Sequence, residues 1–444
     1  MKIGFGRKDI TPRPGVELQG YGPYLCRHSD GVRDPLYARA AAFAAGKRCA
    51  VMVSCDIAGV SADITKRVRT RVAEQTDLQP DQVMVHAIHT HSGPATRVYS
   101  GWGTPDPPYI EILPYKIAQA CIDAYNDLDD AVLSHAEVPC EGLGINREHD
   151  AFRAESVEDA LREDWRPAKP ELTDTTCHVF KVERNGKMAG FFSYFGCHPV
   201  VGGPGNPKIH GDYAGVATNL IERLHPGCTG FFLQGAQGDV NTAATACNEA
   251  DTMRALDVLG ARYARSVLAG LDRASSVDVS DLNVVSRAFV FSRKDWGRTD
   301  IEQMLKERED ILHDPEASDA DVQLRHKMVE VSALRRMLAQ LDRGESLAPP
   351  IEIQGFRIGP IRILATPFEV QRAIKNEFLE QAGNGTVLLV GLTNDSMGYA
   401  ADRDVAARGG YAADRVPFIC GQAPYANVHE ELVQALLETN RALN

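Results

Sequence analysis

The sequence predicts an α/β protein, formed as a single large layered domain with mixed β-sheets and an inserted helical hairpin. Three observations predict this class. Short apolar runs that stop at Gly, Pro or a polar residue recur along the chain, which is typical of buried strands. Stretches of helical length separate several of them, as in the strand–helix–strand order of residues 49–88. Residues 299–343 differ in texture and carry apolar side chains at helical spacing.

The expected elements follow from apolar periodicity and from the breakers between them. Residues 1–48 are rich in loops, and residues 148–170 are charged and form a surface excursion. Strands are expected at 49–55, 82–88, 191–197, 230–234, 351–358, 361–365 and 385–391, with further strand-like segments up to 145. Helices are expected at 61–76, 109–128, 216–224 and 427–443.

Residues 299–343 are interpreted as two antiparallel helices, a hairpin inserted into a domain that spans residues 1–444. Glutamate and arginine fill the faces that the apolar residues leave. A solvated structural insert and a wall or lid for a pocket both fit this pattern, and the sequence leaves the choice open.

Charge and composition exclude several classes of protein. The formal net charge of −12 excludes a nucleic-acid partner, and no basic run is dense enough to bind anionic lipid. We expect no membrane insertion, and because the first residues hold no apolar leader we expect a cytoplasmic protein. The ten cysteines form no CxxC pair, which predicts free buried thiols. Nothing in the sequence indicates an oligomeric partner.

The chain is organised around residues 83–94, where an apolar run meets a His-Thr-His sequence and then Ser-Gly-Pro. Because side chains alternate along a strand, His89 and His91 are expected to point the same way and His86 the other way. Zinc favours imidazole ligands, so His89 and His91 are candidates for a metal or acid–base site. His86 is expected to be structural.

Two further strand ends carry possible ligands. His198 follows an aromatic run and is stopped by a proline, as in residues 83–94, so we interpret it as a ligand. Glu369 follows the predicted strand 361–365 and is a candidate third ligand. His210 and Asp212 lie in a loop and fit helix capping or the site equally well. The glycine-rich loop at 235–241 is no P-loop, since no Gly-Lys-Ser/Thr follows.

Together these pieces resemble the catalytic domain of the neutral ceramidase family, and the likeness runs in order along nearly the whole chain. The motifs that carry it are His89-Thr90-His91-Ser92-Gly93-Pro94, Asn146-Arg147, Cys197-His198-Pro199, Gly238-Asp239-Val240, Pro367-Phe368-Glu369 and Gly398-Tyr399. The first of them matches the family's HTHSGP and is the most specific.

The resemblance implies a zinc-dependent amidohydrolase. His89, His198, Glu369 and Tyr399 would hold one zinc ion per chain, with the remaining position left for the water that attacks the amide. His91 would act as a proton shuttle beside the metal. By the same resemblance, Arg147 and Tyr411 would hold or polarise the scissile carbonyl.

One departure concerns the residue after Gly-Asp-Val, where the family has a serine and this chain has Asn241. An asparagine can donate a hydrogen bond to an oxyanion, but it is no hydroxyl nucleophile. The loops at 202–206, 210–212 and 236–242 are polar or small. We therefore expect a small, water-soluble amide substrate whose polar parts are read by Gln237, Asn241 and Asn394.

Several alternatives to a small-amide hydrolase remain open. The chain could be a ceramidase or another N-acyl lipid amidase, or a zinc esterase that uses the same metal-activated water. A degenerate homologue that binds a ligand without turning it over belongs to a different class, and Asn241 in the serine position is its best support.

Overall fold

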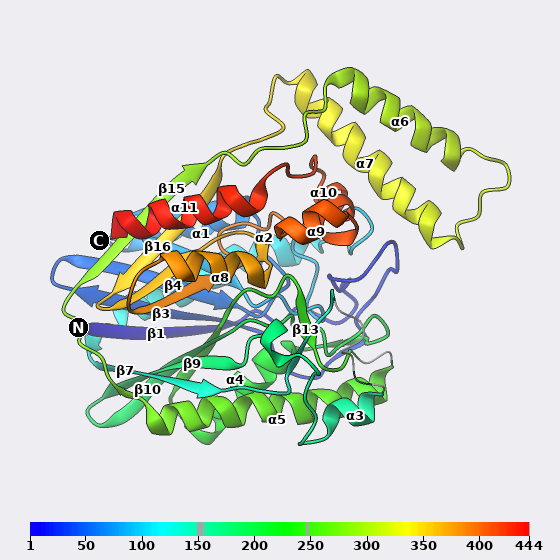
Figure 1. Ribbon diagram of the computed structural model, residues 1–444. Coiled ribbons are helices and arrows are strands. Elements are labelled where there is room, and N and C mark those ends of the chain that lie inside the picture. The colour runs from blue at the N-terminus through cyan, green and yellow to red at the C-terminus, as the bar shows by residue number, and fades with distance from the viewer. Residues whose placement is uncertain (149–153, 155, 246–247, 444) are drawn as a thin grey trace.

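Three mixed β-sheets pack around a shared core in the computed structural model, which describes residues 1–148, 154, 156–245 and 248–443 (Figure 1). The first sheet has the order β5-β4-β3-β1-β6, from β1 (Lys2–Asp9), β3 (Tyr37–Ala45), β4 (Arg48–Cys55), β5 (Val83–Ala87) and β6 (Asp129–Asp130). Its helices are α1 (Ala62–Gln75) and α2 (Pro107–Asn126). Each begins at a capping residue, since the Ser61 and Asp106 side chains accept backbone N–H bonds from their first turns.

The second sheet has the order β12-β10-β9-β7-β14 and carries the longest helix. Its strands are β7 (Val132–Pro139), β9 (Thr176–Arg184), β10 (Lys187–Phe195), β12 (Thr229–Gln234) and β14 (Ser275–Ser276). Helices α4 (Asp212–Leu224) and α5 (Glu249–Arg273) cover its outer face through a cluster of buried apolar residues. The small helix α3 (Val157–Leu161) packs beside α5.

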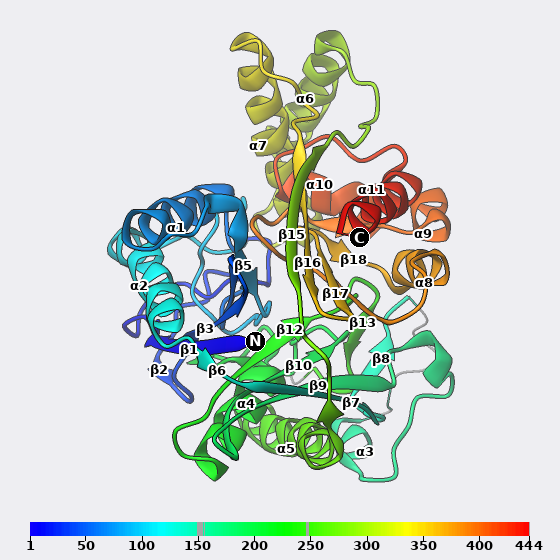
Figure 2. The same ribbon diagram turned by 90° about the vertical axis from the view of Figure 1, so that its left-hand side faces the viewer.

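The third sheet has the order β15-β16-β17-β19, from β15 (Leu282–Phe289), β16 (Ile351–Ile358), β17 (Ile361–Ala365) and β19 (Thr386–Val390). Helices α8 (Arg372–Gln381) and α11 (Val428–Leu443) cover it. Figure 2 shows the three sheets meeting at the centre of the molecule with their helices outside. Phe192 lies in this centre, stacked on Phe180 and Phe231 and edge-on to Phe43 of the first sheet.

Each sheet contains one parallel pair of strands: β4 with β5, β10 with β12, and β17 with β19. Loops that follow the carboxyl ends of such strands are where α/β proteins place their ligand sites. Four short strands form two-stranded pairs beside these loops, β8 (Gly144–Asn146) with β13 (Val240–Thr242) and β18 (Glu369–Val370) with β20 (Tyr399–Ala400), and of these β13, β18 and β20 follow strands of the parallel pairs. A further pair joins β2 (Gly31–Val32) to β11 (Lys208–Ile209).

Helices α6 (Arg298–Leu312) and α7 (Val322–Asp342) form the helical hairpin expected at 299–343, and they project from the body in Figure 1. The outer part of the hairpin is exposed. The inner face of α7 packs against α10 (Val416–Ile419) through a cluster that includes Val329, Leu334 and Met337. The hairpin is thus a second layer behind residues 416–420. The assignment of the whole chain to one domain stays a prediction.

Most expected elements lie within a few residues of their predicted bounds, with α4 beginning four residues early at Asp212. The nine cysteines among the described residues are free thiols, and seven of them are buried; Cys247 lies outside the described residues. Among the helices that the structure describes, none combines the length and the apolar character needed to cross a membrane. The charged excursion expected at 148–170 falls partly outside the described residues, which here exclude 149–153 and 155.

Candidate metal centre

Loops from all three sheets meet at one place and bring the predicted site residues together. His89 and His91 follow β5, and His198 follows β10. Glu369 and Tyr399 lie opposite each other in the short parallel pair β18–β20. His89 Nε2 lies 3.2 Å from Glu369 Oε2, and His198 Nε2 lies 3.1 Å from the same oxygen, separations that are expected between ligands of a single ion.

His89 and His91 lie together, although strand alternation is the wrong reason for it. Strand β5 ends at Ala87, and His89 has φ 73°, a left-handed conformation that is uncommon outside glycine. The turn is held from the 56–58 loop, because His89 N–H donates to the Ile57 carbonyl and His89 Nδ1 lies 2.5 Å from the Ala58 carbonyl. Strained backbone of this kind is typical of functional sites.

The hydrogen bonds of His89 and His198 fix the tautomer of each ring. A carbonyl oxygen can only accept, so Nδ1 of His89 donates to Ala58 and Nδ1 of His198 donates to Gln237, at 2.9 Å. Both Nε2 atoms therefore present lone pairs. Burial lowers the pKa of His198 to about 4, which keeps that ring neutral at pH 7.

When both rings are neutral, two imidazole lone pairs and a carboxylate oxygen thus face one another. Glu369 Oε2 is buried and has no hydrogen-bond donor among the described residues. Three electron-rich atoms in contact repel one another unless a cation lies between them. Imidazole and carboxylate ligands suit zinc, and carbonyl groups that accept from the outer ring nitrogen are the usual support of metal-binding histidines. The residues therefore fit a divalent metal ion.

Tyr399 and Arg147 line the next layer of the site. The Tyr399 hydroxyl lies 3.4 Å from His198 Nε2, close enough to join the same ion. The Arg147 guanidinium lies over the Tyr399 ring at 4.7 Å and faces the Tyr411 ring at 6.0 Å. One of its nitrogens, Nη2, is buried without a partner among the described residues. Tyr411 is 45% exposed and stands at the edge of the site.

His91 is part of the cluster but is supported differently from the two other histidines. Its Nε2 lies 3.2 Å from His89 Nε2, while its Nδ1 is buried with no partner among the described residues. Burial, reinforced by the neighbouring His89 and His198, holds its pKa well below the usual range. The ring rests on Gly20, where a Cβ would lie 2.4 Å from His91 Cγ. A neutral, fixed imidazole beside the metal position can accept a proton.

Asn241 lies in β13, next to the metal position. Its backbone forms a bridge with His198, and it pairs with Ile145 of β8, two residues before Arg147. Its side-chain oxygen is buried without a partner in the described part of the chain. The unpartnered polar atoms of Asn241, in β13, and of Arg147, directly after β8, therefore lie beside the cluster.

Other candidates serve the scaffold. His86 is buried on the far side of β5, where Nδ1 meets the Ser54 hydroxyl and Nε2 accepts from the Gln234 N–H, as expected for a structural residue. His210 accepts from the Asp212 N–H and contacts the Asn206 amide. Both residues that the sequence left open, His210 and Asp212, thus have structural hydrogen bonds.

A second histidine cluster is held by a hydrogen bond and is not arranged as a chelate. His135, Glu137 and His178 lie on one face of the β7–β9 pair. The two rings are nearly parallel, at 8°, with nitrogens 3.2 Å apart and centroids 5.4 Å apart. The separation of the centroids exceeds that of the nitrogens by about twice the radius of an imidazole ring. The rings therefore meet edge to edge, with their nitrogens aimed at each other. A shared proton fits between them, whereas a metal ion needs both lone pairs aimed at a third point.

A cavity opens onto the metal position. His89, His91, Glu369 and Tyr399 form its polar end. The remaining wall is mainly apolar, and its larger members are Tyr99, Trp102, Leu392, Val416 and Ile419. The sequence predicted that polar or small residues surround the substrate, and this prediction is wrong. Gln237, Asn241 and Asn394, which were expected to read the substrate, are not among the residues that line this cavity. Asn394 instead joins β5 to Gln354 through its amide.

Sequence reasoning did not find the apolar wall. Trp102 follows no strand and stands in a Gly-Trp-Gly sequence that reads as a turn. Residues 416–420 are placed by α7, which is distant in sequence. The one feature of the sequence that relates to this wall is the apolar inner face of the hairpin. That face alone does not indicate which residues it packs against.

Comparison with known proteins agrees with this arrangement. The family model for the N-terminal part of neutral/alkaline non-lysosomal ceramidases matches residues 1–281. The chain belongs to this family. Family membership supports a hydrolase that acts on amide bonds.

Two solved structures share the fold. The neutral ceramidase from Pseudomonas aeruginosa superposes with a TM-score of 0.74 at 20% sequence identity, over all of this chain and 74% of that one. A ceramidase complexed with C2 gives a TM-score of 0.75 at 20% identity, over all of this chain and 75% of that chain. At such identity the likeness establishes the mixed α/β fold alone.

Proposed function

We propose that this chain is a zinc-dependent hydrolase that cleaves the amide bond of an N-acyl substrate with an apolar chain. The observation that carries the proposal is the convergence of His89 Nε2 and His198 Nε2 on Glu369 Oε2, at 3.2 and 3.1 Å. His89, His198, Glu369 and Tyr399 would hold one zinc ion. When bound, zinc lowers the pKa of water to about 7 and polarises a carbonyl oxygen.

The protein's own residues supply orientation and proton transfer. Neutral His91 takes the proton of the attacking water and returns it to the leaving amine. The buried Arg147 Nη2, which has no partner among the described residues, would stabilise negative charge on the carbonyl oxygen, and the N–H groups of the Asn241 amide would have to turn toward that oxygen to assist. Asn241 replaces a hydroxyl with a hydrogen-bonding amide, so we assign it this supporting role and no nucleophilic step.

The apolar wall changes the substrate that was expected from the sequence. A small polar amide would make no apolar contact with the sides of Trp102, Val416 and Ile419 that face the cavity, whereas an acyl or alkyl chain would pack against them. The structures that this chain resembles are ceramidases, one of them complexed with C2. We therefore propose an N-acyl amide with one apolar chain in the cavity, and ceramide is a candidate of this class.

Hydrolysis of a series of N-acyl amides with acyl chains of increasing length tests the proposal. We expect kcat/KM to rise with chain length, activity to be lost on chelation and restored by zinc, and Glu369→Ala to be inactive. His178→Gln, at a histidine outside the site, is the matched control and should stay active. Cleavage of esters alone would favour an esterase. Zinc binding without turnover of any amide or ester would favour the ligand-binding alternative and refute the proposal.

A further inference from the structure

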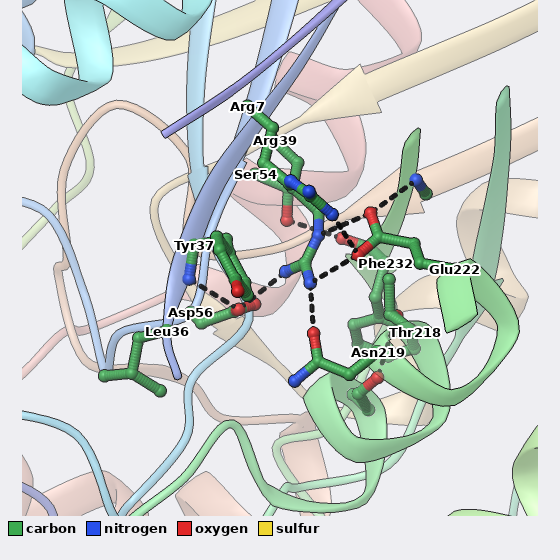
Figure 3. A network of polar contacts seen from close by, with 12 residues as sticks. Arg7, Leu36, Tyr37, Arg39, Ser54, Asp56, Thr218, Asn219, Glu222 and Phe232 are labelled. Atoms are coloured by element: carbon green, nitrogen blue, oxygen red, sulfur yellow. Dashed lines mark hydrogen bonds and ion pairs between the residues drawn. The ribbon is translucent and has the colours of Figure 1, made fainter. Parts of the chain in front are cut away.

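A buried ion cluster lies behind the metal centre and joins the sheet of His89 to the helix beside His198. Arg39 of β3 is 1% exposed, and it donates to Asp56 at 2.6 Å and to Glu222 of α4 at 3.1 Å (Figure 3). It also donates to the Asn219 side chain, one turn earlier on α4. Asp56 is the end of the cluster that is nearer to the metal centre, and it is the first residue of the 56–58 loop that supports His89.

The Asp56 end of the cluster fixes the 56–58 loop. The Asp56 carboxylate accepts from the Tyr37 N–H at 2.9 Å, and its own N–H donates to the Tyr37 carbonyl at 3.0 Å. The next two residues supply the carbonyls of Ile57 and Ala58, which hold the backbone and the ring of His89. A shift of Asp56 would therefore move both supports of this ligand.

The α4 end of the cluster fixes the chain around His198. Tyr213, at the start of α4, donates from its hydroxyl to the Cys197 carbonyl at 2.8 Å. Asp212 accepts the N–H groups of Val201 and Gly202, just beyond His198. The first turn of α4 also approaches Asp56, since a Cβ on Gly211 would lie 3.6 Å from the Asp56 carboxyl carbon.

We infer that Arg39 is a positioning residue that sets the separation of the two histidine ligands. Its guanidinium ties the loop that holds His89 to the helix that holds the chain on both sides of His198. A planar fork can hold Asp56, Asn219 and Glu222 at once, which a lysine ammonium at the same place cannot do with the same geometry. This inference rests on the proposed zinc site. Arg39 itself touches none of the proposed ligands among the contacts of the described residues.

The test measures zinc affinity of the purified, folded protein by competition with a chelator, with zinc alone as the probe. Arg39→Lys should bind zinc at least about tenfold more weakly than the wild type, as expected when the outer support of a ligand is altered. Arg362→Lys is the matched control. Arg362 is also buried, donating to Ala382 and Asn440 beneath α11, away from the site. The Arg362→Lys variant should have a lower melting temperature than the wild type but a zinc affinity within about twofold of it.

Asn219→Ala provides a second variant if Arg39→Lys does not fold. It removes one acceptor of Arg39 without a charge change, and we expect zinc affinity to fall several-fold. A folded Arg39→Lys or Asn219→Ala protein with unchanged zinc affinity would overturn the inference and leave the proposed function intact. Equal losses in Arg362→Lys and Arg39→Lys would also overturn it, because they would show a general effect of stability. A wild-type protein that binds no zinc would overturn both.

Discussion

Replacing His91 tests whether this residue acts as a proton shuttle or as a metal ligand. Nδ1 of His89 and of His198 each donates to a carbonyl group, whereas His91 Nδ1 has no partner among the described residues. Metal-binding histidines almost always have that outer hydrogen bond. We therefore expect His91→Ala to keep zinc and to lose activity by about 10²–10⁴-fold, the usual contribution of general acid–base catalysis. That loss equals about 2.7–5.4 kcal/mol of transition-state stabilisation.

Gly20→Ala perturbs the same ring without removing it. A Cβ at Gly20 would overlap His91 Cγ, and the φ of 115° at this residue disfavours any other amino acid. The variant should also keep zinc while its kcat falls. Zinc content by elemental analysis and kcat/KM on an N-acyl amide are measured for both variants, with His198→Ala as the control that loses the metal. Loss of zinc from His91→Ala would show that His91 is a ligand, and full activity would remove it from the mechanism.

Three further predictions address the cavity, the response to pH and the core. Trp102→Leu should favour acyl chains longer by about two methylenes, raising their kcat/KM about 15-fold from about 0.8 kcal/mol for each buried methylene; an unchanged profile across acyl lengths would mean that Trp102 does not limit the chain. Burial lowers the pKa of His86 to about 3, below its unfolded value of about 6.5, so its contribution to stability is complete above pH 6.5 and is lost as pH falls toward 3. In His86→Gln, the free energy of unfolding, measured by urea titration, should change less steeply with pH between pH 6 and 4. The same slope as in the wild type would contradict this. Phe192→Ala should lower the free energy of unfolding by about 3–5 kcal/mol, because it leaves a cavity between Phe180 and Phe231; a loss under about 1 kcal/mol would show that the sheets do not pack as described.

The sequence was most informative where strands end. His198 and Glu369 each follow an apolar run that a breaker terminates, and strand ends in an α/β fold meet at one edge. The mixed α/β class and most of the elements were predictable because the elements are long and their periods are clear. The union of His89 and His91 was expected from alternation, but it depends on a left-handed turn held by carbonyl groups at Ile57 and Ala58, and no local pattern shows such a turn.

The features that were missed depend on contacts between distant parts of the chain. Trp102 becomes a cavity wall only because the hairpin packs behind it, with His326 of α7 beside the indole at 6.1 Å. Arg39 stands in the Ala-rich run of β3, where an isolated charge in a buried strand is a signal that it has partners. The identity of those partners, Asp56 and Glu222, comes from tertiary packing and could not be read from spacing.

Anomalous X-ray scattering at the zinc absorption edge, from crystals of the zinc-loaded wild-type protein, tests the metal centre most directly. The zinc site proposed here predicts one strong peak per chain between His89 Nε2, His198 Nε2 and Glu369 Oε2, with the Tyr399 oxygen next to it. It also predicts no peak between His135 and His178, whose nitrogens point at each other. A peak at that second cluster alone, or no peak at the first cluster in crystals shown to contain zinc, would contradict the proposed metal centre.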